Sequence, residues 1–112
     1  MRIMTGSDFM QAKADIRQQL NAQTGRLGWK ELERHFARGS VIKVAGELDL
    51  VEVAACVAQD DKATIEFWLA SGRLAPADTE DALVWHGRQA EFWAVVVAPW
   101  VLVQEIRGQD AD

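Results

Sequence analysis

The sequence contains little cysteine, tyrosine or proline. Its 112 residues include one cysteine, two prolines and no tyrosine. A lone cysteine, Cys56, cannot close an internal disulfide, so nothing indicates an oxidising compartment. The longest apolar run, residues 92–103, is shorter than the roughly 20 residues that span a bilayer. Because residues 1–10 also lack the apolar core of a secretory signal, we expect a cytoplasmic protein without a membrane segment.

The rest of the composition is that of an ordinary globular domain. Apolar residues make up 49% of the chain and charged residues 26%, which excludes disorder and collagen-like order. A chain of this length can bury a core without a metal or a disulfide. We therefore expect one domain over residues 1–112, with frayed ends at 1–6 and 107–112.

The net charge of −5 hides an uneven distribution. Residues 1–43 carry eight Lys/Arg and four Asp/Glu, whereas residues 44–112 carry four and thirteen. The first part of the chain is thus at +4 and the second at −9. Such asymmetry can guide self-association, or it can cancel inside the folded domain, which is the interpretation we favour.

Apolar periodicity and capping residues predict most of the secondary structure. Helices are expected at 7–23, 29–38, 50–58, 62–71 and 79–86, with Gly25 and Gly28 bracketing a break. Runs rich in valine and other apolar residues predict strands at 41–45, 92–98 and 100–105, and a short strand is expected at 73–75 before Pro76. Pro99 leaves open whether the last two are one bent strand or a hairpin.

The strongest start signal precedes the helix at 50–58. Asp49 fits an N-cap with Glu52 three residues later, and the helix is apolar on nearly all sides. This helix should be buried centrally, with Cys56 as a small core residue. The acidic pair Asp60 and Asp61 is expected to cap its successor.

The order of these elements favours an α+β fold with a winged-helix-like topology, in which helices pack on a small antiparallel sheet. A capped helix, an acidic break, a second helix and then Gly72-Arg73-Leu74 are similar to a helix-turn-helix that enters a wing. Short helix pairs also occur in many other α+β folds.

The residues also resemble an uncharacterised bacterial family, the domain of unknown function 2288. The resemblance covers roughly residues 20–105 and rests on 29–32 with Phe36, 47–54, Asp60-Asp61, Trp68-Leu69 with Gly72, and 93–105. It implies a small bacterial cytoplasmic protein. No activity, substrate or cofactor comes with it.

The charge pattern argues against nucleic-acid binding through the second helix of the pair. Phosphate contacts require Lys or Arg on the docking face, and residues 62–71 offer Lys62 alone. Arg34 and Arg38 are i, i+4 neighbours that can touch phosphate, although a solvated basic face is the interpretation we favour. A nucleic-acid-binding regulator is therefore an alternative of lower rank.

No pattern predicts a catalytic, metal or cofactor site. His35 and His86 are far apart in sequence, and neither belongs to a metal-binding motif. The carboxylates Asp49 and Glu52 are explained by helix capping. A small enzyme with an unrecognised site remains the third alternative.

Five tryptophans are many for a chain of this length. Trp29, Trp68 and Trp93 lie on apolar stripes or a strand, and we expect them in the core. Trp85 and Trp100 are candidates for an exposed aromatic anchor, because tryptophan is enriched at interface hot spots. The sequence thus favours a non-catalytic protein-interaction or self-associating module, with a protein partner or a homodimer. Its candidate surface comprises Trp85, Trp100, Arg34 and Arg38.

Overall fold

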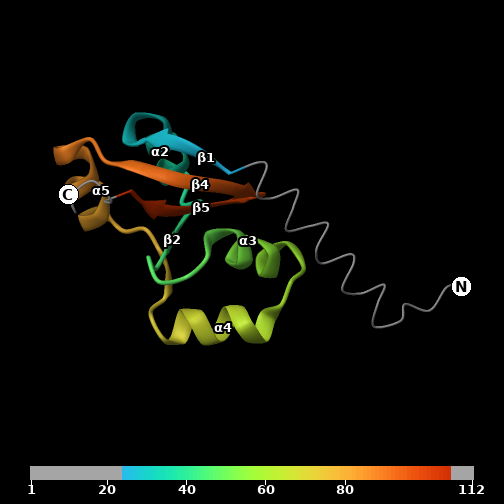
Figure 1. The fold of residues 1–112 in the computed structure, drawn as a ribbon. Helices are drawn as coiled ribbons and strands as arrows, with labels where there is room; N and C mark the ends of the chain where they lie inside the picture. The colour runs from blue at the N-terminus through green and yellow to red at the C-terminus, as the bar shows by residue number, and fades with distance from the viewer. Residues whose placement is uncertain (1–23, 107–112) are drawn as a thin grey trace, which may run out of the picture.

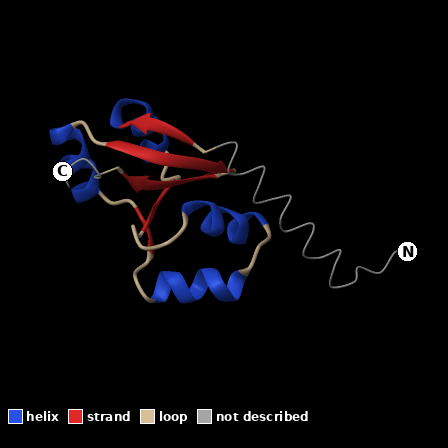
Figure 2. Cartoon of the chain, in the orientation of Figure 1, coloured by secondary structure: helices blue, strands red, loops and turns tan. Residues whose placement is uncertain are grey.

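A computed structural model describes residues 24–106 of the chain. The elements follow in the order β1 (Gly25–Gly28), α2 (Trp29–Ala37), β2 (Val41–Val44), α3 (Leu50–Ala58), α4 (Lys62–Ala70), β3 (Leu74–Pro76), α5 (Thr79–Arg88), β4 (Glu91–Val97) and β5 (Trp100–Glu105). The strands form one five-stranded sheet, and the helices lie around it (Figures 1 and 2).

The sheet is mixed, with the strand order β1-β4-β5-β2-β3. β2 and β5 pair in parallel, and the other neighbouring strands pair antiparallel. The expected α+β class is confirmed. The winged-helix-like detail is not confirmed, because β1 and β2 join the same sheet as the β4–β5 pair, and β2 runs parallel to β5.

Helices cover both faces of the sheet. α2 and α5 pack on one face around Trp29, Leu32 and Phe92. α3 packs on the other face over Val95 and Leu102, with α4 outside it. Alternate residues of β2, β4 and β5 enter the two cores, because successive side chains of a strand point to opposite faces. The domain therefore has two cores, separated by the sheet.

Asp49 and Asp61 cap α3 and α4, whereas Asp60, the other member of the acidic pair, lies before the cap of α4 with φ 58°. Asp49 accepts hydrogen bonds from the backbone N–H groups of Val51 and Glu52, and α3 is buried as expected. Asp61 Oδ1 accepts from Thr64 N at 3.3 Å and so caps α4. These bonds satisfy N–H groups that have no partner inside the first turn of a helix.

Some element boundaries differ from the predictions. The helix expected at 7–23 lies outside the described residues. Where a break was expected between Gly25 and Gly28, the chain forms β1, because pairing with β4 overrides the low strand propensity of glycine. α5 continues through Gly87 to Arg88, and the left-handed residue that ends it is Gln89, with φ 49°. The last two strands form an antiparallel hairpin, which settles the alternative left open by Pro99.

Candidate functional site

A cleft of 470 Å³ lies between α5 and the sheet. Lys43 of β2 and Ala75 of β3 line the sheet side, and Val84 and Arg88 line the helix side. Loops close one end with Arg73, which follows α4. A concave surface with a few convergent polar groups is the usual form of a binding site, so this cleft is the candidate site.

Two ion pairs lie on the walls of the cleft. Lys43 Nζ is 2.8 Å from Asp81 Oδ2, and Arg88 Nη2 is 2.7 Å from a carboxylate oxygen of Glu105. The Glu105 side chain is 13% exposed and the Lys43 side chain 36%. Lys43 and Arg88 are therefore each neutralised by a carboxylate of the same domain, and these cleft walls carry no excess of positive or negative charge.

Asp81 has a second role at the start of α5. Its Oδ2 accepts from Asp78 N at 3.0 Å, while Asp78 Oδ1 accepts from Asp81 N at 2.9 Å, which makes a capping box. Burial acts to raise the pKa of Asp81, but the Lys43 ammonium and the Asp78 backbone N–H hold it below its ordinary value of 3.8. The Asp81 carboxylate is therefore ionised at neutral pH, both as the partner of Lys43 and as a capping group.

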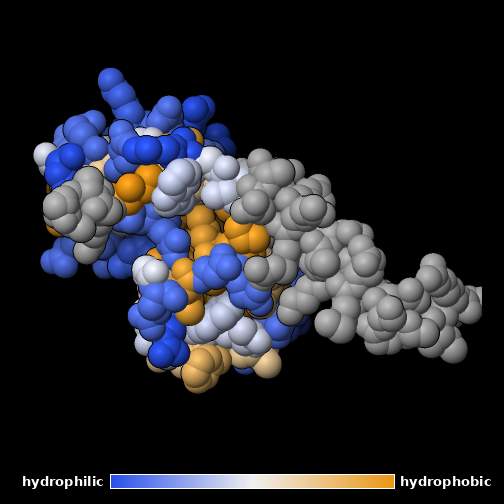
Figure 3. All heavy atoms as spheres, viewed as in Figure 1, coloured by the Kyte–Doolittle hydropathy of each residue, from blue (hydrophilic) through white to orange (hydrophobic). Residues whose placement is uncertain are grey.

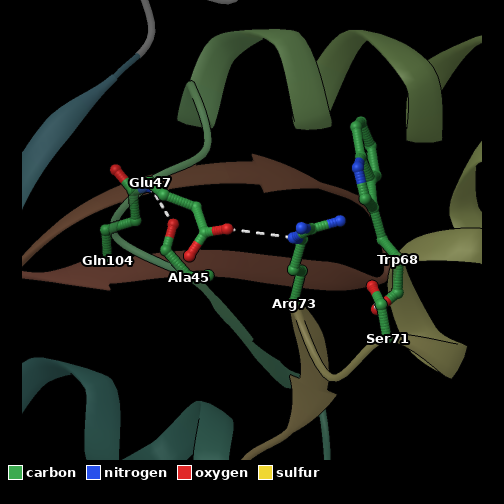
Figure 4. Close-up of polar contacts among 6 residues, drawn as sticks. All are labelled: Ala45, Glu47, Trp68, Ser71, Arg73 and Gln104. Atoms are coloured by element: carbon green, nitrogen blue, oxygen red, sulfur yellow. Dashed lines mark hydrogen bonds and ion pairs between the residues drawn. The ribbon is translucent and has the colours of Figure 1, made fainter.

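Hydrogen bonds fix the loops that close the cleft. Gln104 Nε2 donates to Ala45 O at 2.8 Å (Figure 4). It also donates to Leu48 O at 2.6 Å, and so holds the loop between β2 and α3. Arg73 Nε donates to Glu47 Oε2 at 2.9 Å, which joins that loop to the start of β3. The two loops are thus cross-linked by side chains from β5 and from the turn after α4.

Exposed apolar side chains lie on or next to residues that line the cleft. Leu83 and Val84 of α5 are 67% and 52% exposed. Phe67 of α4 is also exposed, and its ring lies 5.8 Å from the Arg73 guanidinium. Val84 lines the cleft and Leu83 is its neighbour on α5, so these two side chains are the apolar part of the candidate contact surface.

The structure corrects the expectation for two tryptophans. Trp85 is 5% exposed, because its ring packs edge-on against Phe92 with the ring centroids 4.8 Å apart. It is therefore a core residue, and the prediction of an exposed anchor at Trp85 is wrong. It also lines the cleft. Trp93, expected in the core, is 43% exposed, although it lies on the same face of β4 as Val95, which α3 covers. Trp29 is buried as expected.

The remaining predicted surface residues do not form one patch. Trp100 is 40% exposed, as expected. It lies on the face of the sheet that α3 covers, because its strand-pairing partner Val97 lies on that face. Arg34 of α2 and its C-cap residue Arg38 are exposed, and α2 lies on the opposite face of the sheet with α5. The structure thus brings Arg34 and Arg38 to the α5 side of the sheet and separates them from Trp100.

The cleft was not found by sequence reasoning, because its ion pairs join residues distant in the chain. Lys43 pairs with Asp81 and Arg88 with Glu105, and each pair depends on how α5 crosses the sheet. One signal in the sequence could have indicated this surface. Leu83 and Val84 are apolar, yet they lie on a short helix whose buried residue is Trp85.

Metal-ligating side chains and long apolar helices were sought in the described part of the chain. Residues 24–106 contain no group of three His, Cys, Asp or Glu side chains that could hold a metal ion. Cys56 is buried in α3. Within the same residues, no helix has both the length and the apolar character needed to cross a bilayer.

Comparison with known proteins agrees with this fold and assigns no activity. The chain is similar to the NMR solution structure of PA1075 from Pseudomonas aeruginosa, with 37% sequence identity and a TM-score of 0.71. The match covers 94% of this chain and 92% of that one. No functionally curated protein matches the sequence. The model of the family described as "Protein of unknown function (DUF2288)" matches residues 15–105, and the chain belongs to that family.

Proposed function

We propose that this protein is a non-catalytic interaction module that self-associates through α5 and the cleft beside it. The observation that carries the proposal is the exposure of Leu83 and Val84 at the margin of a cleft whose cations are already paired. Burying such side chains against another apolar surface contributes roughly 25 cal/mol per Å². The Lys43–Asp81 and Arg88–Glu105 ion pairs beside them add specificity for a partner of matching charge pattern, without giving the surface a large net charge.

A second copy of the chain suits this surface. Most soluble homo-oligomers have a two-fold axis, so the same patch meets itself and must be self-complementary. Apolar side chains meet this condition. The Lys43–Asp81 and Arg88–Glu105 ion pairs are formed within one copy, so they do not repel the same ion pairs of the second copy. Two cations of the basic first part of the chain are neutralised within one copy, because Arg26 pairs with Glu91 and Lys43 pairs with Asp81. The opposite charges of the two parts of the chain therefore need not hold two copies together.

The burial of Cys56 supports the non-catalytic part of the proposal. A nucleophilic cysteine needs access to substrate and a neighbouring group that stabilises the thiolate, whereas Cys56 lies inside α3 among core residues. We extend the proposal to a cytoplasmic location in bacteria, supported by the single cysteine of the chain and by its similarity to a Pseudomonas protein.

Sedimentation equilibrium of the full chain tests the proposal. A monomer–dimer equilibrium is expected, and Val84→Asp should weaken it about tenfold or more, because a charge then enters the apolar contact. The matched control is Leu69→Asp, which places the same charge at an exposed apolar position of α4 outside the cleft lining. A strict monomer at all concentrations, or equal effects of the two substitutions, contradicts self-association through α5.

Nucleic-acid binding is the second candidate, and one observation favours it. Lys30 and Arg34 of α2 and its C-cap residue Arg38 recur at every fourth position, and no described carboxylate lies within 4.0 Å of them. Near α4, in contrast, Lys62 faces Asp60 and Arg73 faces Glu47. A row of three cations on one helix can contact consecutive phosphates.

Fluorescence anisotropy with a generic DNA duplex distinguishes the two candidates. Binding through α2 should weaken steeply as salt rises and should be lost in Arg34→Glu with Arg38→Glu. If neither low salt nor high protein concentration produces binding, this second candidate is excluded and the self-association proposal is unaffected.

A further inference from the structure

The side of α5 that faces away from the core carries Glu80, Leu83, Val84 and Gly87. These residues are spaced i, i+3, i+4 and i+7, so they lie on one side of the helix. All four are exposed, whereas Trp85, on the opposite side, is buried. We refer to the four residues as the outer face of α5. The middle of this face is apolar, and it adjoins the cleft that Val84 lines.

Gly87 distinguishes the outer face from other exposed apolar surface, such as the hydrophobic atoms that Figure 3 shows between the sheet and α3. Glycine inside a helix lowers the stability of that helix relative to alanine. The described residues give no reason for this cost. Gly87 is not one of the described glycines with positive φ, and a Cβ there meets no atom within 4 Å. The missing side chain instead gives a second helix room to approach α5 closely.

The charges of α5 favour a second copy of the same helix in antiparallel orientation. Its first turn carries Glu80 and Asp81, and its last turn carries His86 and Arg88. Antiparallel helices bring the acidic first turn of each copy beside the basic last turn of the other, whereas parallel helices bring like charges together. Glu80 forms no ion pair among the described residues, so its carboxylate is available to the other copy.

We propose that α5 packs antiparallel against α5 of a second copy, with Gly87 as the point of closest approach; this inference rests on the self-association proposed above. The two-fold axis passes between Leu83 and Val84, midway between positions 80 and 87. The leucine and valine of both copies then pack together at the centre. Glu80 of each copy lies over Gly87 of the other, next to the basic last turn. Gly87 is therefore the residue that determines which helix fits this surface.

Gly87→Ala separates this packing from a purely local role of the glycine. The methyl group raises helix propensity, so the urea midpoint should rise at low protein concentration, where association does not contribute. In sedimentation equilibrium the same change should weaken the dimer about tenfold, because the methyl group meets Glu80 of the other copy. Gly87→Leu should weaken it further. Ala63→Leu, which adds bulk at an exposed position of α4, is the control and should leave the dimer unchanged.

The outcomes of this experiment are distinct. A wild-type dimer that Gly87→Ala leaves unchanged or strengthens overturns the proposed packing and leaves self-association intact. A wild-type protein that is monomeric at all concentrations overturns self-association itself.

Disulfide cross-linking tests the orientation of the two helices. With a mild oxidant, a mixture of Glu80→Cys and Gly87→Cys proteins should form the mixed disulfide faster than either variant pairs with itself, since antiparallel packing brings position 80 beside position 87. Cys56 is buried and should not react. Glu66→Cys, exposed on α4, is the control and should not cross-link. Preferential pairing of Glu80→Cys with itself, or no mixed disulfide from a protein that dimerises, overturns the antiparallel packing without affecting self-association through α5.

Discussion

Trp85 shows how one side chain joins a core to a surface. Its ring packs against Phe92 and against Trp29, with centroids 4.8 and 5.9 Å away, and it also contributes to the floor of the cleft. Its neighbours Leu83 and Val84 on the same helix are exposed. A single turn of α5 thus carries both the residue that anchors the helix and the residues proposed to contact a second copy.

Replacing Trp85 should therefore be far more costly than replacing Leu83. Trp85→Ala is expected to lower the free energy of unfolding by about 3–5 kcal/mol, because it leaves a cavity in the core. Leu83→Ala should cost about 0.5 kcal/mol or less. Urea unfolding at low protein concentration, where association does not contribute, measures both. Similar costs for the two substitutions are incompatible with the burial of Trp85.

Asp81 gives the domain a pH-dependent contribution to stability. Burial acts to raise its pKa, but Lys43 and the Asp78 N–H hold the folded-state pKa below the ordinary value of 3.8. A lowered pKa means that the carboxylate stabilises the fold above that value, and that this stabilisation is lost as the pH falls through the folded-state pKa. Asp81→Asn should thus cost about 1 kcal/mol at neutral pH, as for loss of a capping interaction.

Thermal unfolding of wild type and Asp81→Asn across pH checks this sign. The difference in midpoint should be full at neutral pH and should shrink as the pH falls below 3.8. Glu80→Gln removes a charge from the same helical turn and serves as the control for net charge. A difference that widens on acidification would show that Asp81 is not stabilised as a carboxylate.

At the scale of elements, the capping residues were the most reliable guide in the sequence. Asp49, Asp61 and Asp78 each begin a helix where the pattern predicts one, because a capping bond depends only on residues two or three positions away. β1 was not predicted, since its pairing with β4 joins residues more than 60 positions apart. Local signals therefore predicted the helices, and distant pairing determined the rest of the sheet.

The cap of α4 can be tested at Asp61. Asp61→Ala should lower the free energy of unfolding by about 1 kcal/mol, because the Thr64 N–H loses its acceptor. Asp61→Asn keeps a side-chain oxygen and should retain most of the stability. Glu66→Ala, an exposed position later in α4, controls for loss of charge. Chemical denaturation distinguishes the three, and equal stability of Asp61→Ala and Asp61→Asn would argue against the cap.

Two glycines should respond in opposite directions to the same substitution. Gly72 follows α4 with φ 77°, so Gly72→Ala should cost about 1 kcal/mol through backbone strain. Gly87 lies within α5, and a Cβ there meets no atom within 4 Å. Gly87→Ala should therefore stabilise the domain by about 0.5–1 kcal/mol through helix propensity. Urea unfolding would refute this account if both changes had the same sign.

For the molecule as a whole, the sequence predicted the fold class and the family and missed the site. The α+β class follows from periodicity, and the family from blocks such as 93–105. The cleft depends on how α5 is placed over β2 and β5, which brings Lys43 to Asp81 and Arg88 to Glu105. No local pattern encodes that placement, so neither the cleft nor its apolar margin was predictable from spacing.

The central claim is that two copies meet through α5, and dilution of the full chain followed by NMR amide shifts tests it most directly. As the concentration falls, shift changes are expected along α5 and around the cleft, with no comparable changes on α2 or α4. Shifts that do not change with concentration, or changes confined to α2, would contradict the claim.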